Sequence, residues 1–129
     1  MSTGTKSADE TGDVIEVADL LERVDGDRDL LLELARMFRE DAPTLLANVR
    51  QAASARDAEA LERAAHALKG SCANFGATAA RDAAFALEQR GRSRQLDQVD
   101  EHVALIGSEI ERLCDALFAL EGALKASDA

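Results

Sequence analysis

Residues 96–124, LDQVDEHVALIGSEIERLCDALFALEGAL, decide the fold. Apolar residues recur along this stretch at alternating spacings of three and four without a slip, which is the a/d pattern of helices that pack side by side. The pattern predicts one long helix, which Ser93 can cap at its start. The seam consists of Leu96, Val99, Val103, Ile106, Ile110, Leu113, Leu117, Leu120 and Leu124. Such a helix can form a two-chain coiled coil, or it can be the wall of a bundle within one chain.

Two short helices are predicted before residue 41. Residues 14–24 carry apolar side chains at helical spacing, and Asp25 and Gly26 end that stretch. Asp27 can cap a second helix that runs as far as Glu40. The apolar stripe of the second helix comprises Leu30, Leu31, Leu34, Met37 and Phe38.

A break and restart is predicted at Asp41, Ala42 and Pro43. Proline is tolerated in the first turn of a helix and not deeper, so a new helix is expected to begin here and to run to about Ala55. The sequence therefore predicts two separate helices on either side of Pro43.

Two further helices are predicted to form an antiparallel pair. Asp57 can open the first, which ends near Gly76, and Thr78 can cap the second, which runs to about Arg90 and ends at Gly91. The connection between them is short, which forces the antiparallel arrangement. Small side chains let the two backbones approach closely. The second helix is built from Ala79, Ala80, Ala83, Ala84, Phe85, Ala86 and Leu87.

Composition supports an all-α fold. The chain of 129 residues has 47% hydrophobic residues, 3% aromatic residues and one proline, which favours helix over sheet. We expect an antiparallel four-helix bundle formed by the helices after residue 41, with one or two extra helices before it that cover one end. The bundle domain is predicted to span residues 14–125. Residues 1–13 are polar and are predicted to be a disordered leader.

Charge and cysteine content exclude several classes of function. The formal net charge of −10 argues against binding to nucleic acid or to an anionic membrane. No apolar run is long enough for a membrane span, and the N-terminal residues lack the apolar core of a signal peptide, so a cytoplasmic location is expected. Cys72 and Cys114 form no CxxC pair and are expected to be reduced thiols, without a metal.

A helical wheel of residues 57–76 places His66 opposite the apolar line, so its imidazole is predicted to face water. Lys69 lies one turn further on, and Gly70 leaves bare backbone one turn from the ring. Glycine inside a helix costs roughly 0.5–1 kcal/mol relative to alanine, so it is expected to provide clearance for a docking partner. The apolar line comprises Leu61, Ala64, Leu68, Ser71, Cys72 and Phe75.

These residues resemble the histidine-containing phosphotransfer (HPt) domains of two-component phosphorelays. The family motif appears here as His66-Ala67-Leu68-Lys69-Gly70-Ser71 followed by Asn74-Phe75-Gly76-Ala77. The resemblance extends over roughly residues 15 to 120. It includes Arg23-Val24-Asp25-Gly26-Asp27, Glu40-Asp41-Ala42-Pro43, Leu87-Glu88 and Gly91-Arg92.

The resemblance implies a phosphocarrier rather than an enzyme. His66 would accept a phosphoryl group from the phospho-aspartate of a receiver domain and pass it to the aspartate of a second receiver. The expected partners are response regulator receiver domains and a hybrid sensor histidine kinase, and the receivers would supply Mg²⁺. The chain contains neither GxxxxGK nor GxGxxG, so we expect no ATP site and no cofactor of its own. A monomer is expected.

The nucleophile needs a partner that holds its tautomer. His66 lies 10 residues before Gly76 and Glu88 lies 12 after it, so both stand roughly 15–18 Å from the turn and can be neighbours. A carboxylate that accepts the Nδ1 proton leaves Nε2 as the nucleophile. Many family members carry glutamine at this position, so Glu88 and Gln89 are both candidates. Glu88 can equally be an ordinary solvated residue.

Charge on the phosphoryl group is predicted to be balanced by Lys69 and, by resemblance, by Arg92; Arg63 is a further candidate. His102 lacks this context and is interpreted as a surface residue. Glu62 and His66 have metal-ligand spacing, but the chain has no second such pair.

Two other functions remain open. One is an HPt-like adaptor that docks receivers or kinases without phosphotransfer, and the other is an assembly domain that uses the seam of residues 96–124.

Overall fold

The computed structural model describes residues 14–128, and every regular element among them is a helix. The all-α prediction is therefore confirmed for this part of the chain. The leader predicted at residues 1–13 lies outside the described residues. No helix within 14–128 is long and apolar enough to cross a membrane. The helices are α2 (Val17–Arg23), α3 (Arg28–Ser54), α4 (Ala58–Ala73), α5 (Thr78–Ser93) and α6 (Val99–Asp128).

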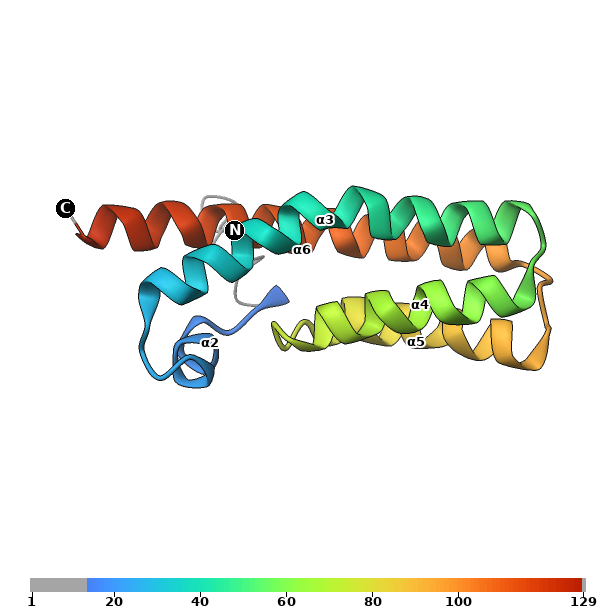
Figure 1. Ribbon diagram of the computed structural model, residues 1–129, viewed down its shortest axis with the longest axis horizontal. Coiled ribbons are helices and arrows are strands. Elements are labelled where there is room, and N and C mark those ends of the chain that lie inside the picture. The colour runs from blue at the N-terminus through green and yellow to red at the C-terminus, as the bar shows by residue number, and fades with distance from the viewer. Residues whose placement is uncertain (1–13, 129) are drawn as a thin grey trace, which may run out of the picture.

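Four of these helices form an up-down-up-down bundle. The long helices α3 and α6 lie along one side, and the shorter pair α4 and α5 packs against one half of them (Figure 1). Each helix contacts the next around the bundle, and α6 closes it by contacting α3. The short helix α2 packs against α3 at the end that α4 and α5 leave uncovered (Figure 1). One covering helix is therefore present, because the second predicted helix, up to Glu40, is the first part of α3.

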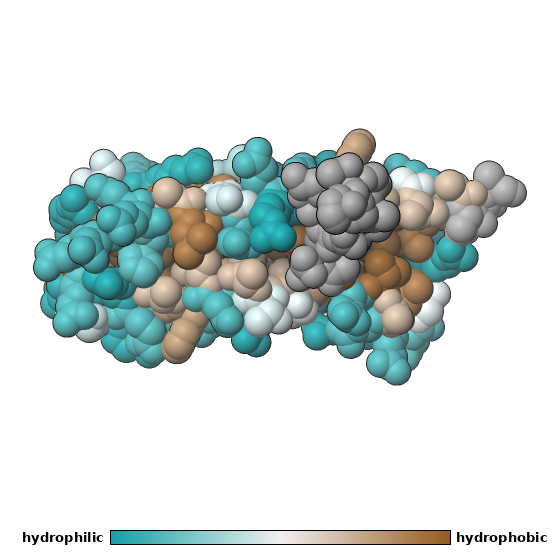
Figure 2. All heavy atoms as spheres, turned by 180° about the vertical axis from the view of Figure 1, so that it is seen from behind, coloured by the Kyte–Doolittle hydropathy of each residue, from teal (hydrophilic) through white to brown (hydrophobic). Residues whose placement is uncertain are grey.

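The seam of residues 96–124 is buried inside this bundle, which makes α6 a wall of its own chain's core. Its side chains from Ile106 to Leu124 are at most 4% exposed. Val103 is half-buried, and Leu96 lies before the helix. Seen from behind, hydrophilic side chains cover most of the surface and apolar groups show between them in patches (Figure 2). The seam therefore needs no second chain to bury it.

The break predicted at Pro43 is wrong, because α3 runs through it as one helix of 27 residues. Proline removes one backbone hydrogen bond and bends a helix, and α3 is bent in Figure 1. The buried stripe nevertheless continues in phase across the proline, so burial on both sides offsets the lost hydrogen bond. The stripe comprises Leu31, Ala35, Phe38, Ala42, Leu46, Val49, Ala52 and Ala53.

Two of the predicted N-terminal caps are confirmed. The carboxylate of Asp27 accepts a hydrogen bond from Leu30 N–H at 3.0 Å, and that of Asp57 accepts one from Ala60 N–H at 3.0 Å. The cap predicted at Thr78 is wrong: Ala77 is the N-cap of α5, without a side-chain hydrogen bond.

The end predicted for α5 at Gly91 is also wrong. The helix continues to Ser93 and ends at Arg94, whose φ of 58° is left-handed. Gly91 is buried against α4, where a Cβ atom would lie 2.7 Å from the carbonyl oxygen of Ala58 and 2.7 Å from the amide nitrogen of Glu62. This glycine therefore permits close helix packing rather than ending a helix. Ser93 lies in the last turn of α5 and does not cap α6, which begins at Val99.

Several side chains assigned to apolar stripes are exposed. On α3, Leu30, Leu34 and Met37 are 38–45% exposed. Leu34 and Met37 line an open groove where α2 and α3 meet. On α5, Phe85 is 43% exposed. Cys72 and Cys114 are free thiols as expected.

Candidate functional site

Helix α4 buries one face and exposes His66 on the other, as its sequence predicts. Leu61, Leu68 and Cys72 are fully buried in the bundle, whereas 67% of the His66 side chain is exposed. Burial raises the pKa of the Cys72 thiol to about 12, so this cysteine is an inert core residue. The imidazole is thus carried by a rigid helix and remains open to a partner.

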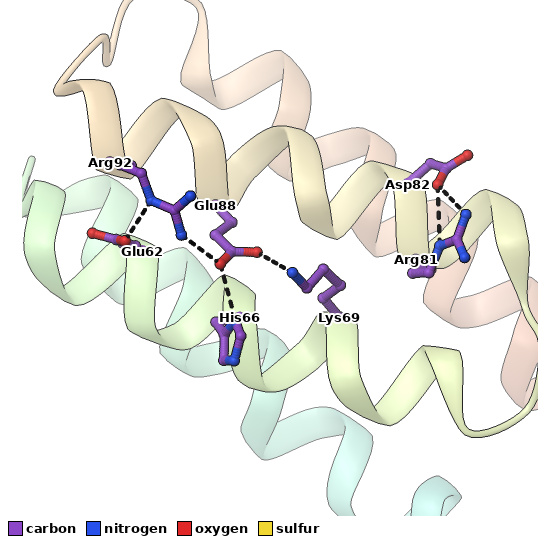
Figure 3. A network of polar contacts seen from close by, with 7 residues as sticks. All are labelled: Glu62, His66, Lys69, Arg81, Asp82, Glu88 and Arg92. Atoms are coloured by element: carbon purple, nitrogen blue, oxygen red, sulfur yellow. Dashed lines mark hydrogen bonds and ion pairs between the residues drawn. The ribbon is translucent and has the colours of Figure 1, made fainter.

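Glu88 reaches the imidazole from α5. Its carboxylate Oε2 lies 2.9 Å from His66 Nδ1, and the residue is 2% exposed (Figure 3). The structure places Glu88 against the ring, while Gln89 is exposed. A solvated Glu88 is therefore excluded.

Two cations and the imidazole surround this buried carboxylate. Besides the His66 contact, Lys69 Nζ lies 2.8 Å from Oε1 as an ion pair that lacks hydrogen-bond alignment, and Arg92 Nη2 donates to Oε2 at 3.0 Å (Figure 3). Burial by itself raises the pKa of Glu88, but Lys69 and His66 outweigh it and hold that pKa below its ordinary value. Glu88 is therefore ionised at neutral pH.

The tautomer of a neutral His66 follows from this charge. An ionised carboxylate can only accept hydrogen bonds, so Nδ1 must carry the proton that is donated to Glu88. The lone pair then lies on Nε2, which points away from the carboxylate in Figure 3. This arrangement presents a nucleophilic nitrogen to the exterior.

Arg92 is held by two carboxylates. Its Nε donates to Glu62 Oε2 at 2.9 Å while its Nη2 donates to Glu88. The ion pairs with Glu62 and, less strongly, Glu88 raise the pKa of the Arg92 guanidinium. The sequence singled out Glu62 only as a metal ligand. The spacing argument could have found this contact, because Glu62 and Arg92 lie 14 residues before and 16 after Gly76, with the same offset as His66 and Glu88.

The same pairing brings Phe85 next to Lys69. The ammonium lies 5.1 Å from the centroid of the Phe85 ring, a cation–π distance. A shallow cavity of about 410 Å³ opens here between α4 and α5, lined by Lys69, Gly70, Phe85 and Arg81 among others. Phe85 was expected among the residues that build α5, without a role at the site.

The remaining candidates lie as follows. Gly70 is exposed, and a Cβ atom on it would have no neighbour within 4 Å, so the fold itself does not require a glycine. Arg63 is exposed and pairs with Glu59 at 3.8 Å. His102, interpreted as a surface residue, is half-buried on α6. Among residues 14–128 no three His, Cys, Asp or Glu side chains are grouped so that they could hold a metal ion.

An apolar groove lies beside the exposed face of α4. It has a volume of about 410 Å³ and lies where α2 and α3 meet the end of α4, and Leu34 and Met37 are exposed on its wall. Ser71 and Asn74 line its α4 side. The groove therefore adjoins the helix that carries His66 and Gly70.

The site is thus a histidine on one helix of an antiparallel helical bundle, held by a carboxylate of the next helix. A family model described as the Hpt domain matches residues 33–120. This match covers more than half of the chain, so the chain belongs to the Hpt domain family. Searches of curated proteins and of solved structures returned no match. Hpt domains are histidine-containing phosphotransfer modules of two-component systems, phosphocarriers without an ATP site that interact with receiver domains and kinases.

Proposed function

We propose that this protein accepts a phosphoryl group on His66 from the phospho-aspartate of a receiver domain and passes it to an aspartate of another receiver in a multistep phosphorelay. The observation that carries the proposal is the buried, ionised Glu88 carboxylate at 2.9 Å from Nδ1 of an exposed imidazole. That contact leaves Nε2 unprotonated and directed outward.

The transfer step balances without any further reactant. The Nε2 lone pair attacks phosphorus, the N–P bond forms, and the P–O bond to the aspartyl carboxylate breaks. The aspartate leaves as a carboxylate. The ring keeps its Nδ1 proton and gains positive charge, which the Glu88 carboxylate at 2.9 Å neutralises. Because every step is reversible, the same contact serves donation to the second receiver.

Lys69 is the cation proposed to balance charge on the transferred phosphoryl oxygens. It lies one turn from His66 and already occupies the space between Glu88 and Phe85. The role of Arg92 at the phosphoryl group stays a prediction, since its Nε and Nη2 both bond carboxylates. Mg²⁺ is expected to come from the receiver. A hybrid sensor kinase as partner, a cytoplasmic location and a monomeric state also remain predictions.

Surface shape and charge support docking over His66. The bare backbone at Gly70 leaves room beside the ring, and the apolar groove at Leu34 and Met37 offers a contact surface next to the end of α4. The segment 50–94, which contains the site, has eight basic and five acidic residues in a chain whose net charge is −10. An Mg²⁺-binding receiver site is rich in carboxylates, so this basic segment complements it.

Labelling of the protein by a phosphorylated receiver tests the proposal. We expect an acid-labile, base-stable phosphoryl group that His66→Gln abolishes. His102→Gln is the matched control and should retain the label. Label that persists in His66→Gln would overturn the assignment. A receiver that binds the wild-type protein without labelling it would instead indicate a docking adaptor.

A further inference from the structure

One oxygen of Glu88 serves two donors. His66 Nδ1 lies 2.9 Å from Oε2, and Arg92 Nη2 lies 3.0 Å from the same atom (Figure 3). Lys69 engages the other oxygen, Oε1. The imidazole and the guanidinium therefore share the acceptor atom that fixes the histidine tautomer.

Glu62 limits how many donors Arg92 turns toward Glu88. A guanidinium has five N–H donors in a rigid fork and prefers to bind one carboxylate through two parallel hydrogen bonds. In this structure Nε of Arg92 is bonded to Glu62 Oε2 at 2.9 Å, so only Nη2 is used on Glu88. Without Glu62, Nε of Arg92 loses its partner. The guanidinium is then free to bind Glu88 through both Nε and Nη2.

We propose that Glu62 is a positioning residue that restrains Arg92 and thereby keeps Glu88 Oε2 available to the Nδ1 proton of His66. Glu62 acts through Arg92 and not on the reacting atoms. Its effect on the tautomer is a property of the unphosphorylated protein. Only the consequence for phosphotransfer rests on the function proposed above.

The packing of α4 against α5 makes this arrangement specific. Gly91 lies against the backbone of Glu62, which brings the two helices close at the level of Arg92. The charged and titratable groups that face Glu88 are His66 and Lys69 from α4 and Arg92 from its own helix, with Glu62 behind Arg92. Glu59, one turn earlier on α4, pairs with Arg63 instead and is a matched control.

The first experiment measures the His66 tautomer by ¹⁵N-resolved NMR of the unphosphorylated protein, at a pH where the spectra show a neutral ring. Glu62→Ala should shift the Nε2 resonance toward that of a protonated nitrogen, because the ring loses part of its acceptor. Glu59→Ala should leave the resonance unchanged. Arg92→Ala should also keep the Nδ1–H tautomer, since it removes the guanidinium that shares Oε2 with the ring.

The double variant Glu62→Ala/Arg92→Ala decides whether Glu62 acts through Arg92. We expect its Nε2 resonance to match that of Arg92→Ala alone. An equal shift in the presence and absence of Arg92, or no shift in Glu62→Ala, would overturn the proposal. Circular dichroism of each variant shows whether the bundle is intact, and Glu62→Gln, which keeps the side-chain length, provides a second test if Glu62→Ala fails to fold.

A kinetic measurement connects the tautomer to the proposed function. Loss of one charge-assisted hydrogen bond predicts a decrease of about tenfold in the rate constant of phosphotransfer from a receiver to Glu62→Ala. In a protein that already carries Arg92→Ala, adding Glu62→Ala should not lower the rate constant further. A wild-type protein that accepts no phosphoryl group while the NMR shifts follow the predicted pattern would refute the function and leave the positioning role standing.

Discussion

At the scale of single residues, Glu88 determines the chemistry of the site. A buried carboxylate is costly unless cations and hydrogen bonds compensate for lost hydration. Lys69, His66 and Arg92 provide that compensation. The same contacts fix the imidazole, so the stability of the site and the orientation of its histidine depend on one charge.

The lowered pKa of Glu88 predicts how stability depends on pH. An unfolded glutamate titrates at about pH 4.3. Because the folded pKa lies below the unfolded one, Glu88 contributes its full stabilisation above that pH and loses it as the pH falls through the folded pKa. Glu88→Gln should therefore show a smaller loss of unfolding free energy on acidification, measured by chemical denaturation between about pH 7 and 3.

At neutral pH the same variant should be destabilised by about 1–3 kcal/mol, because Lys69 and Arg92 lose a charged partner. Glu111→Gln, an exposed substitution on α6, is the control and should change neither quantity. A Glu88→Gln profile parallel to that of the wild type would show that the Glu88 carboxyl does not titrate differently on folding.

At the scale of secondary structure, two glycines on the facing helices have opposite roles. Gly91 is packed against the backbone of α4, while Gly70 has open space where a side chain would stand. Sequence alone predicted instead that Gly91 ends its helix, since a glycine near a helix end is commonly a C-terminal signal. Only the distance between α4 and α5 shows that Gly91 is needed for helix packing and Gly70 is not.

Alanine substitutions at these glycines should change stability in opposite directions. Gly91→Ala inserts a methyl group 2.7 Å from two backbone atoms and should cost about 1–3 kcal/mol of unfolding free energy, since backbone cannot move aside easily. Gly70→Ala should stabilise by about 0.5–1 kcal/mol through helix propensity. Thermal and urea denaturation of both variants measure this. A stabilising Gly91→Ala would mean that α4 and α5 lie further apart than described.

Helix α3 illustrates how tertiary packing overrides a local signal. Pro43 would end an isolated helix, yet Ala42 before it and Leu46 after it face the same core. Helices in proteins are stabilised mainly by burial of an apolar face. The continuous stripe therefore keeps the 27 residues in one bent helix.

At the scale of the whole molecule, the bundle buries the α6 seam in its own core. The most exposed large apolar side chain among the described residues is Phe118 at 66%, and its ring lies 5.1 Å from the guanidinium carbon of Arg39. Arg39 in turn bonds the buried Glu121. The alternative of an assembly domain needed the α6 seam as an interface, and that seam is buried within this chain.

We therefore predict a monomer. The seam is occupied within the chain, and the net charge of −10 opposes self-association. Sedimentation equilibrium should give the mass of one chain, 13.8 kDa, at all concentrations tested. Phe118→Ser should not alter this mass. A dimer that Phe118→Ser dissociates would instead identify the outer face of α6 as an interface.

The sequence by itself determined the helical class, the buried seam of α6, the caps at Asp27 and Asp57 and the outward face of His66. These features depend on periodicity and local hydrogen bonds, which are properties of neighbouring residues in the chain. Spacing from Gly76 also brought Glu88 within reach of His66, but it left Gln89 and a solvated Glu88 as alternatives.

Tertiary structure alone decided which carboxylate holds the imidazole, how Arg92 is shared between Glu62 and Glu88, and why Gly91 is a glycine. It also decided that α3 continues through Pro43. The first three depend on the distance and rotation between α4 and α5, and the last depends on burial of both halves of α3 against the core. Residues far apart in the chain set this geometry by packing together. The residue pattern of one helix does not specify this geometry, because the same polar face can lie against solvent or against a neighbouring helix.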